Sequence, residues 1–192
     1  MLLDLVRKNR SCRRFIEDSK IEKQTLRDLV NLGRHCPSGA NLQPLKYAIC
    51  NNPEMNNKIF NHIQWAGYLK QWNGPSPGQR PSAYIIVLGD KAIKKNFDHD
   101  VGIQAQTILL GAVELGFGGC MIGSIVDKKE LREKLDIPET LDIILLIALG
   151  KPDEKIVLED IKPDGDIKYY RDEKDIHHVP KRTLNEILVK EF

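Results

Sequence analysis

The most informative stretch of this chain is Asn9-Arg10-Ser11-Cys12-Arg13-Arg14-Phe15-Ile16, in which three arginines fall within five positions. Like charges this close together repel one another unless they share an anion. A phosphate is such an anion, because each planar guanidinium donates to its oxygens in pairs and a serine hydroxyl adds a further donor. The alternative is a basic end to a first helix, which the negative end of the helix dipole favours.

A second polar segment, Cys36-Pro37-Ser38-Gly39-Ala40-Asn41-Leu42-Gln43-Pro44, lies between a helical stretch and an apolar run. Pro37 and Pro44 fix φ near its two ends, and Gly39 allows backbone geometry that other residues avoid. Ser38, Asn41 and Gln43 offer neutral hydrogen-bond donors and acceptors, which suit the edge of a polar heterocycle. The same composition is also typical of an ordinary turn.

Composition and charge narrow the class of protein. The chain has 192 residues, 41% of them hydrophobic and 29% charged, which predicts one globular domain. The net charge is only +2, whereas a nucleic-acid-binding protein usually has a larger basic excess. The four cysteines are scattered, so neither a zinc site nor a disulfide framework is indicated. No apolar run is long enough to span a membrane and no signal peptide is evident, so we expect a cytoplasmic protein.

Hydrophobic periodicity predicts helices at residues 2–8, 23–35, 53–63, 100–115 and 128–135, and a last apolar helical stripe at 184–188. Strands are predicted at residues 45–50, 83–88 and 143–149, with a short strand that ends at Gly123. The helix over 100–115 is apolar on most faces and therefore needs cover from a sheet, other helices or a second subunit. Beyond Asp153 the sequence is polar, which predicts a single domain over residues 1–192 with a tail, 153–192, too poor in apolar residues to fold against itself.

Three motifs in order, Arg10-Ser11-x-Arg13, Pro37-Ser38-Gly39-x-Asn41-x-Gln43-Pro44 and Pro180-Lys181-Arg182, resemble the FMN-dependent nitroreductase family over nearly the whole chain. The resemblance implies an α+β fold. It implies a three-layer sandwich with a mostly antiparallel central sheet flanked by helices. It also implies a tail-exchanged homodimer in which residues 153–192 wrap the partner subunit.

The resemblance further implies a cofactor site. Its phosphate end would be held by Arg10, Ser11 and Arg13, with Lys181 or Arg182 arriving from the tail. The loop from Pro37 would approach the isoalloxazine from the other subunit, and the strand ending at Gly123 would lie along the flavin edge near N5. Cys12, inside the phosphate motif, is expected to pack. The expected cofactor-binding residues are Arg10, Ser11, Cys12, Arg13, Pro37, Ser38, Gly39, Asn41, Gln43, Met121, Ile122, Gly123, Lys181 and Arg182, with no catalytic side chain and no metal ligand.

The implied function is an FMN-dependent oxidoreductase. It would use NADH or NADPH to reduce nitroaromatic, quinone or related acceptors by ping-pong hydride transfer through flavin N5. Its partners would be a small-molecule electron acceptor and a second copy of the chain, not nucleic acid or a membrane. Two alternatives stay open, namely a non-catalytic FMN carrier or sensor and a flavin enzyme that acts by dehalogenation or flavin destruction.

The segment with Trp65, Tyr68 and Trp72 has two interpretations. It could be mobile aromatic cover over the flavin, which would suit flat substrates. It could equally be a core tryptophan followed by a surface loop.

Overall fold

The computed structural model describes residues 1–162 and 165–192, and Pro163 and Asp164 of the expected tail lie outside the described residues. The chain divides into two compact units. The first comprises Met1–Trp65 and Gly74–Asp153, and the second comprises Ala66–Asn73 and Glu154–Phe192. The C-terminal part of the second unit therefore begins one residue after the start of the predicted tail.

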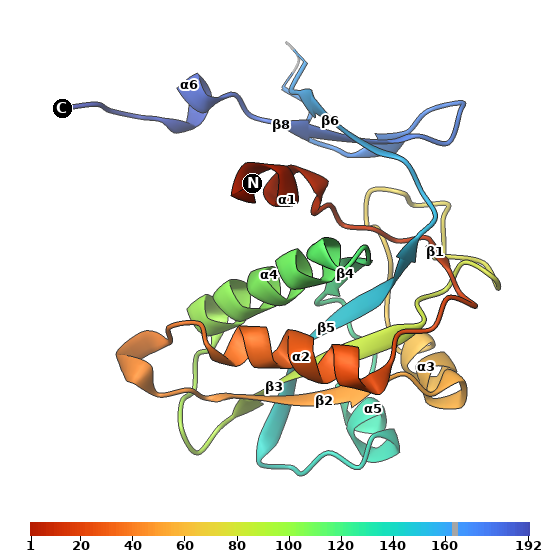
Figure 1. Cartoon of the computed structure of the whole chain (residues 1–192), viewed down its shortest axis with the longest axis vertical. Coiled ribbons are helices and arrows are strands. Elements are labelled where there is room, and N and C mark those ends of the chain that lie inside the picture. The colour runs from red at the N-terminus through yellow and green to blue at the C-terminus, as the bar shows by residue number, and fades with distance from the viewer. Residues whose placement is uncertain (163–164) are drawn as a thin grey trace. The chain divides into compact units, whose positions relative to one another are not determined.

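The first unit is built on a five-stranded sheet (Figure 1). Its strands are β1 (Phe15–Ile16), β2 (Leu45–Cys50), β3 (Ala83–Asp90), β4 (Gly118–Ile122) and β5 (Leu141–Pro152). The order is β1-β5-β3-β2, with β4 also paired to β5, and all these pairings are antiparallel. The fold class predicted from the sequence, an α+β fold with an antiparallel central sheet flanked by helices, is confirmed.

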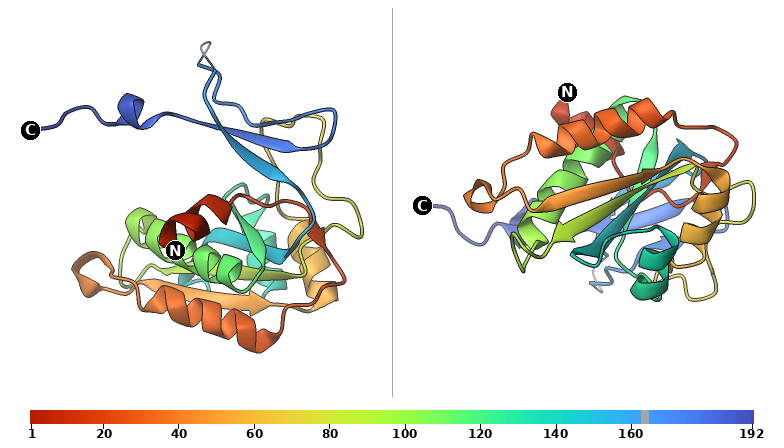
Figure 2. Two further views of the ribbon diagram at one scale, coloured as in Figure 1. Left: turned by 45° about the horizontal axis from the view of Figure 1, so that its top comes forward. Right: turned by 90° about the horizontal axis from the view of Figure 1, so that it is seen from below.

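Helices cover both faces of this sheet (Figure 2). They are α1 (Leu2–Lys8), α2 (Lys23–Arg34), α3 (Pro53–Phe60), α4 (Asp98–Glu114) and α5 (Lys128–Lys134), with a 3-10 turn, η1, at Gly39–Asn41. The helices α2 and α4 pack on one face, while α3 and α5 lie on the other. Two glycines let α2 and α4 approach closely, since a Cβ at Gly111 would lie 2.5 Å from a methyl of Leu32 and one at Gly33 would lie 3.1 Å from Ile108.

Strand β3 shows how the sheet is covered on both sides. Its alternate residues Ala83, Ile85 and Val87 join the core beneath α2 and α4, whereas Tyr84 points to the opposite face because neighbouring side chains alternate along a strand. The residues from Ala83 to Leu88 are all buried. This burial on both faces explains why the strand is apolar without alternation.

The second unit contains β6 (Ile156–Asp160), β7 (Tyr170–Arg171), β8 (His177–Lys181) and the short helix α6 (Leu184–Ile187). Its three strands form a sheet in the order β6-β8-β7, with β6 and β8 parallel. The expectation that the tail cannot fold against itself is therefore wrong. The strands pair through their backbones, and the unit also contains the ion pair between Arg171 and Glu154 at 2.8 Å.

The predicted elements of the first unit are present, α1 and β2 with the predicted bounds and others with shifted ends. The strand predicted at 143–149 extends over Leu141–Pro152, and the helix predicted at 53–63 ends at Phe60. Among the described residues, no helix has the length and apolarity needed to cross a membrane.

Candidate functional site

The arginine segment runs from α1 into β1 and lies beside β4. Ser11 forms a parallel bridge with Gly119, and the Cys12 N–H donates to the Gly119 carbonyl at 2.9 Å. A Cβ at Gly119 would lie 2.7 Å from the Ala148 carbonyl oxygen, a backbone atom that cannot move aside easily. Glycine is thus required where the arginine segment meets the sheet.

Arg10 is the member of this segment best suited to bind an anion. Its Nη2 donates to the Val6 carbonyl at 2.7 Å, while its Nε is buried without a hydrogen-bond partner. Burial lowers the pKa of Arg10 from its ordinary value, because a guanidinium ion loses hydration there. Val6 offers a neutral oxygen rather than a carboxylate, so the positive charge and the buried Nε–H suit an incoming phosphate.

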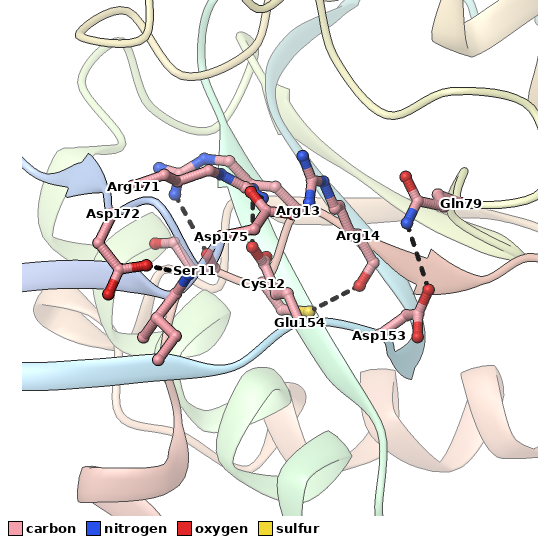
Figure 3. A network of polar contacts seen from close by, with 11 residues as sticks. Ser11, Cys12, Arg13, Arg14, Gln79, Asp153, Glu154, Arg171, Asp172 and Asp175 are labelled. Atoms are coloured by element: carbon pink, nitrogen blue, oxygen red, sulfur yellow. Dashed lines mark hydrogen bonds and ion pairs between the residues drawn. The ribbon is translucent and has the colours of Figure 1, made fainter.

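Arg13 and Cys12 occupy opposite environments within the same segment. Arg13 Nη1 donates to the Ser11 carbonyl at 3.2 Å and remains partly exposed (Figure 3). Cys12 is only 3% exposed, and its Sγ lies 3.2 Å from the Arg14 carbonyl. Its side chain packs in the core, as expected, so only its backbone could contact a cofactor.

The loop after α2 holds an unusual backbone conformation. Ala40, Asn41 and Gln43 have φ angles of 49°, 54° and 50°, a left-handed region that residues other than glycine adopt at a cost. Within the loop, the Gln43 N–H donates to Ser38 Oγ at 3.1 Å, and Gln43 Nε2 donates to the Asn41 carbonyl at 3.2 Å. Asn41 and Gln43 are exposed, which leaves polar side chains open to a ligand.

A buried carboxylate outside the predicted set fixes this loop. Asp100, in the first turn of α4, accepts from the Gly39 N–H at 2.9 Å and from Lys94 Nζ at 2.6 Å, and it is fully buried. Burial by itself would raise the pKa of Asp100, but the hydrogen bonds from Lys94 and Gly39 hold it below its usual value. The sequence signal was an acid at the start of an apolar helix, which the dipole alone could explain.

The arginine segment and the loop lie at different places along α4. Gly39 is tied to Asp100 in the first turn, whereas Gly119, which anchors Ser11 and Cys12, packs against Leu109. Nine residues of helix, roughly 13 Å, separate Asp100 from Leu109. The two predicted parts of the site are therefore anchored at different turns of α4.

Residues at the end of β4 differ in what they present. Met121 is half-buried against the core and Ile122 is 4% exposed, so the Ile122 side chain faces inward. Gly123 is exposed directly after the strand. Met121 and the backbone at Gly123 are thus the accessible parts of this predicted segment.

Lys181 is the last residue of β8 and Arg182 follows it, and both lie in the second unit. Arg182 Nη1 is 3.7 Å from Glu186, and both side chains are largely exposed. The hydroxyl and N–H of Thr183 bond the same glutamate in a capping box that begins α6. The expected contact of Lys181 or Arg182 with a cofactor phosphate stays a prediction.

The aromatic segment is divided between the two units. Trp65 is 7% exposed and packs on Phe60 with ring centroids 5.9 Å apart, which matches the interpretation as a core tryptophan. In the second unit, Tyr68 lies 5.0 Å from the Tyr169 ring and Trp72 lies beneath the Arg171 guanidinium at 5.0 Å. Figure 3 shows the Arg171 side chain bonded to Glu154 and Asp175.

Known proteins resemble this chain in sequence and in fold. A putative NADH dehydrogenase/NAD(P)H nitroreductase of Archaeoglobus fulgidus is 28% identical over 151 residues, 74% of this chain and 81% of that protein. An iodotyrosine deiodinase of Thermotoga neapolitana is 25% identical over 174 residues, 80% of this chain and 90% of that protein.

Among solved structures, a putative nitroreductase in complex with FMN from Desulfovibrio desulfuricans superimposes with a TM-score of 0.69. It is 23% identical, and the match covers all of this chain and 96% of that one, which indicates a shared fold. The model of the nitroreductase family matches residues 6–151, a range that contains the arginine segment, the loop after α2 and β4. The chain therefore belongs to the nitroreductase family.

Proposed function

We propose that the chain is an FMN-dependent oxidoreductase that takes electrons from NADH or NADPH and passes them to a nitroaromatic, quinone or related acceptor. The observation that carries the proposal is Arg10, a half-buried cation whose Nε–H is buried without a partner. It lies in a segment fixed to β4 within the range matched by the nitroreductase family model.

The chain's own residues have defined tasks in this proposal. When bound, FMN supplies hydride transfer between a nicotinamide and the acceptor. Arg10, with Ser11 and Arg13 beside it, binds and orients the phosphate through charge-assisted hydrogen bonds. Asn41 and Gln43 offer amide groups to the polar ring edge, and Asp100 holds their loop in place.

The direct experiment begins with the absorption spectrum of the purified protein, followed by stopped-flow mixing with NADH or NADPH without oxygen. A flavin spectrum that bleaches with either nicotinamide, and recovers on addition of a quinone or nitroaromatic, is expected. A bound flavin that neither nicotinamide reduces would instead identify a carrier or sensor. Protein that takes up no FMN would overturn the proposal altogether.

A second acceptor class is favoured by the similarity to the deiodinase of Thermotoga neapolitana. Reductive dehalogenation would use the same flavin and the same arginine segment. The test adds iodotyrosine to the reduced protein and measures iodide release against reduction of a quinone under the same conditions. Iodide release at a rate comparable to quinone reduction would assign the chain to that class.

A further inference from the structure

A cavity lies on the face of the sheet opposite α2 and α4. Its volume is about 360 Å³, at the small end of the range for ligand sites. Its walls come from the segment after β1, the residue after β2, helix α3, residues 80–82 just before β3, and Tyr84 in β3. None of the residues expected to bind the cofactor lines it.

Three residues that line this cavity each have a side-chain polar atom buried without a hydrogen-bond partner: Asn56 Oδ1, Ser82 Oγ and Tyr84 Oη. Asn56 and Ser82 are less than a tenth exposed and Tyr84 is fully buried. Asn56 Nδ2 donates to the Ser82 carbonyl at 2.8 Å, which fixes the amide orientation and leaves its oxygen as an acceptor. Buried polar groups in folded proteins are nearly all hydrogen-bonded, so three in one wall indicate a polar occupant.

Arg80 adds a positive charge to the same wall. Its Nη1 donates to Asn57 Oδ1 at 2.9 Å, and its guanidinium lies 4.2 Å from the Phe60 ring centre. Both contacts are with neutral groups, and its Nε is buried without a partner. The stacking holds the planar donor fork rigidly, which favours paired hydrogen bonds to a carboxylate.

The carboxylate of Glu17, an acidic residue of the wall, already accepts hydrogen bonds from the backbone. Glu17 Oε2 accepts from the Gly78 N–H at 2.5 Å and from the Arg80 backbone N–H at 3.5 Å, so it is engaged with backbone rather than with the Arg80 side chain. Asp18 and Lys20, also in the wall, are exposed. A tyrosine hydroxyl is neutral at physiological pH, and burial raises the pKa of Tyr84 further.

We propose that this cavity binds a small carboxylate that also carries a hydroxyl or amino group. The carboxylate would meet Arg80 and the hydroxyls of Ser82 and Tyr84. The hydroxyl or amino group would donate to Asn56 Oδ1, the atom of the set that can only accept a hydrogen bond. This site is separate from the proposed flavin site, so its occupancy is measurable without FMN or electron transfer.

Titration calorimetry on the full-length chain tests the proposal with glycolate, glycine, acetate and inorganic phosphate as probes. Glycolate or glycine should bind at least about tenfold more tightly than acetate, which lacks the donor for Asn56. Phosphate should be the weakest probe. Tighter binding of phosphate, or no binding of any probe, overturns the proposal.

Two variants locate the site. Arg80→Met and Tyr84→Phe should each weaken binding of the best probe about tenfold or more. Because the Tyr84 hydroxyl has no partner, its removal should not lower the melting temperature of the free protein. A lower melting temperature for Tyr84→Phe, or unchanged affinity in both variants, contradicts the assignment.

Tyr47→Phe is the matched control. The Tyr47 hydroxyl is hydrogen-bonded to Gln104 on the other face of the sheet. Its loss should lower the melting temperature and leave probe affinity unchanged. The opposite pattern in Tyr47→Phe would show that the probes bind elsewhere.

Discussion

At the scale of single residues, Arg10 and Asp100 have complementary tasks. Arg10 carries a charge whose hydrogen-bond partner within the described chain is a neutral carbonyl, whereas Asp100 is bonded to both a lysine and a backbone N–H. The first is therefore suited to bind an external anion and the second to hold a loop. Substitution of each should affect different measurements.

Arg10→Ala should weaken FMN binding by roughly 10- to 150-fold, since a hydrogen bond to a charged group contributes about 1.5–3 kcal/mol. The apoprotein should keep its melting temperature, because the side chain is not part of the core. Fluorescence titration of the apoprotein with FMN measures the change. Arg27→Ala, at an exposed position on α2, is the control and should bind FMN as the parent does. Equal affinity in both variants would refute the phosphate assignment.

Asp100→Asn should lower the free energy of unfolding by about 1–3 kcal/mol, less than for a fully buried pair because Lys94 is 24% exposed. Urea denaturation measures the loss, and the double variant with Lys94→Met should recover part of it. The pKa of Asp100 is depressed in the fold, so its stabilisation is present above the unfolded pKa and disappears as pH falls through the folded one. The single variant should therefore lose less stability than the parent between about pH 5 and pH 2. A variant as stable as the parent at neutral pH would contradict this role for the pair.

The sequence could predict the arginine segment and the loop because their residue types are unusual for their positions. It could not predict Asp100 as their support. An acid in a first helical turn is common for reasons of the dipole alone, and a single sequence does not show that this one faces Gly39 across 61 positions. The cavity around Arg80 was missed for a similar reason, since its wall residues are distant in sequence and each is ordinary by itself.

At the scale of elements, the predictable parts are those with strong apolar periodicity. Strand β2 was predicted with its bounds and α2 to within one residue, because their apolar residues face one core. Strands β1 and β7 have two residues each, too few for a pattern. Strands β6 and β8 are held by backbone pairing and polar side chains, which periodicity does not detect.

His178 makes the main polar side-chain contacts in the three-stranded sheet β6-β8-β7, here called the tail sheet. Its ring nitrogens lie 2.9 Å from Glu159 on β6 and 3.2 Å from Asp172 after β7, and its ring stacks on Tyr170 at 4.8 Å. Lys162 faces the same tyrosine ring at 5.3 Å. Hydrogen bonds to Glu159 and Asp172 raise the pKa of His178 above its ordinary value.

The tail sheet should therefore be most stable at mildly acidic pH. Because the folded pKa of His178 is raised, its stabilisation is fully present below the unfolded pKa and is lost as pH rises through the folded pKa. Amide exchange of β6 and β8, corrected for intrinsic rates, should accelerate over that interval, and His178→Gln should remove the dependence. A parent protein whose tail protection stays constant above about pH 6.5 would disprove it.

At the scale of the whole molecule, both the separation of the site parts and the exposed apolar residues indicate a second copy. None of the residues of α1 is buried, and Leu2, Leu184 and Ile187 are each at least 60% exposed. Exposed apolar residues of this kind often mark a protein interface. A second copy would also supply the loop that the arginine segment of the first chain does not reach. We therefore infer that the flavin site is composed of two chains.

Mixing two inactive variants tests this inference. A chain with Arg10→Ala keeps an intact loop, and a chain with Asn41→Ala keeps an intact arginine segment. If the sites are shared, a heterodimer of these two chains has one site that carries both substitutions and one site that carries neither. Random exchange makes half of the dimers mixed, so about one quarter of all sites should regain FMN affinity and NAD(P)H oxidation. If each site came from one chain, every site would keep one lesion and activity would stay at the parental variants' level. Mass spectrometry of the intact dimers must confirm exchange, because only then does unchanged activity reject the shared site while leaving FMN binding by Arg10 intact.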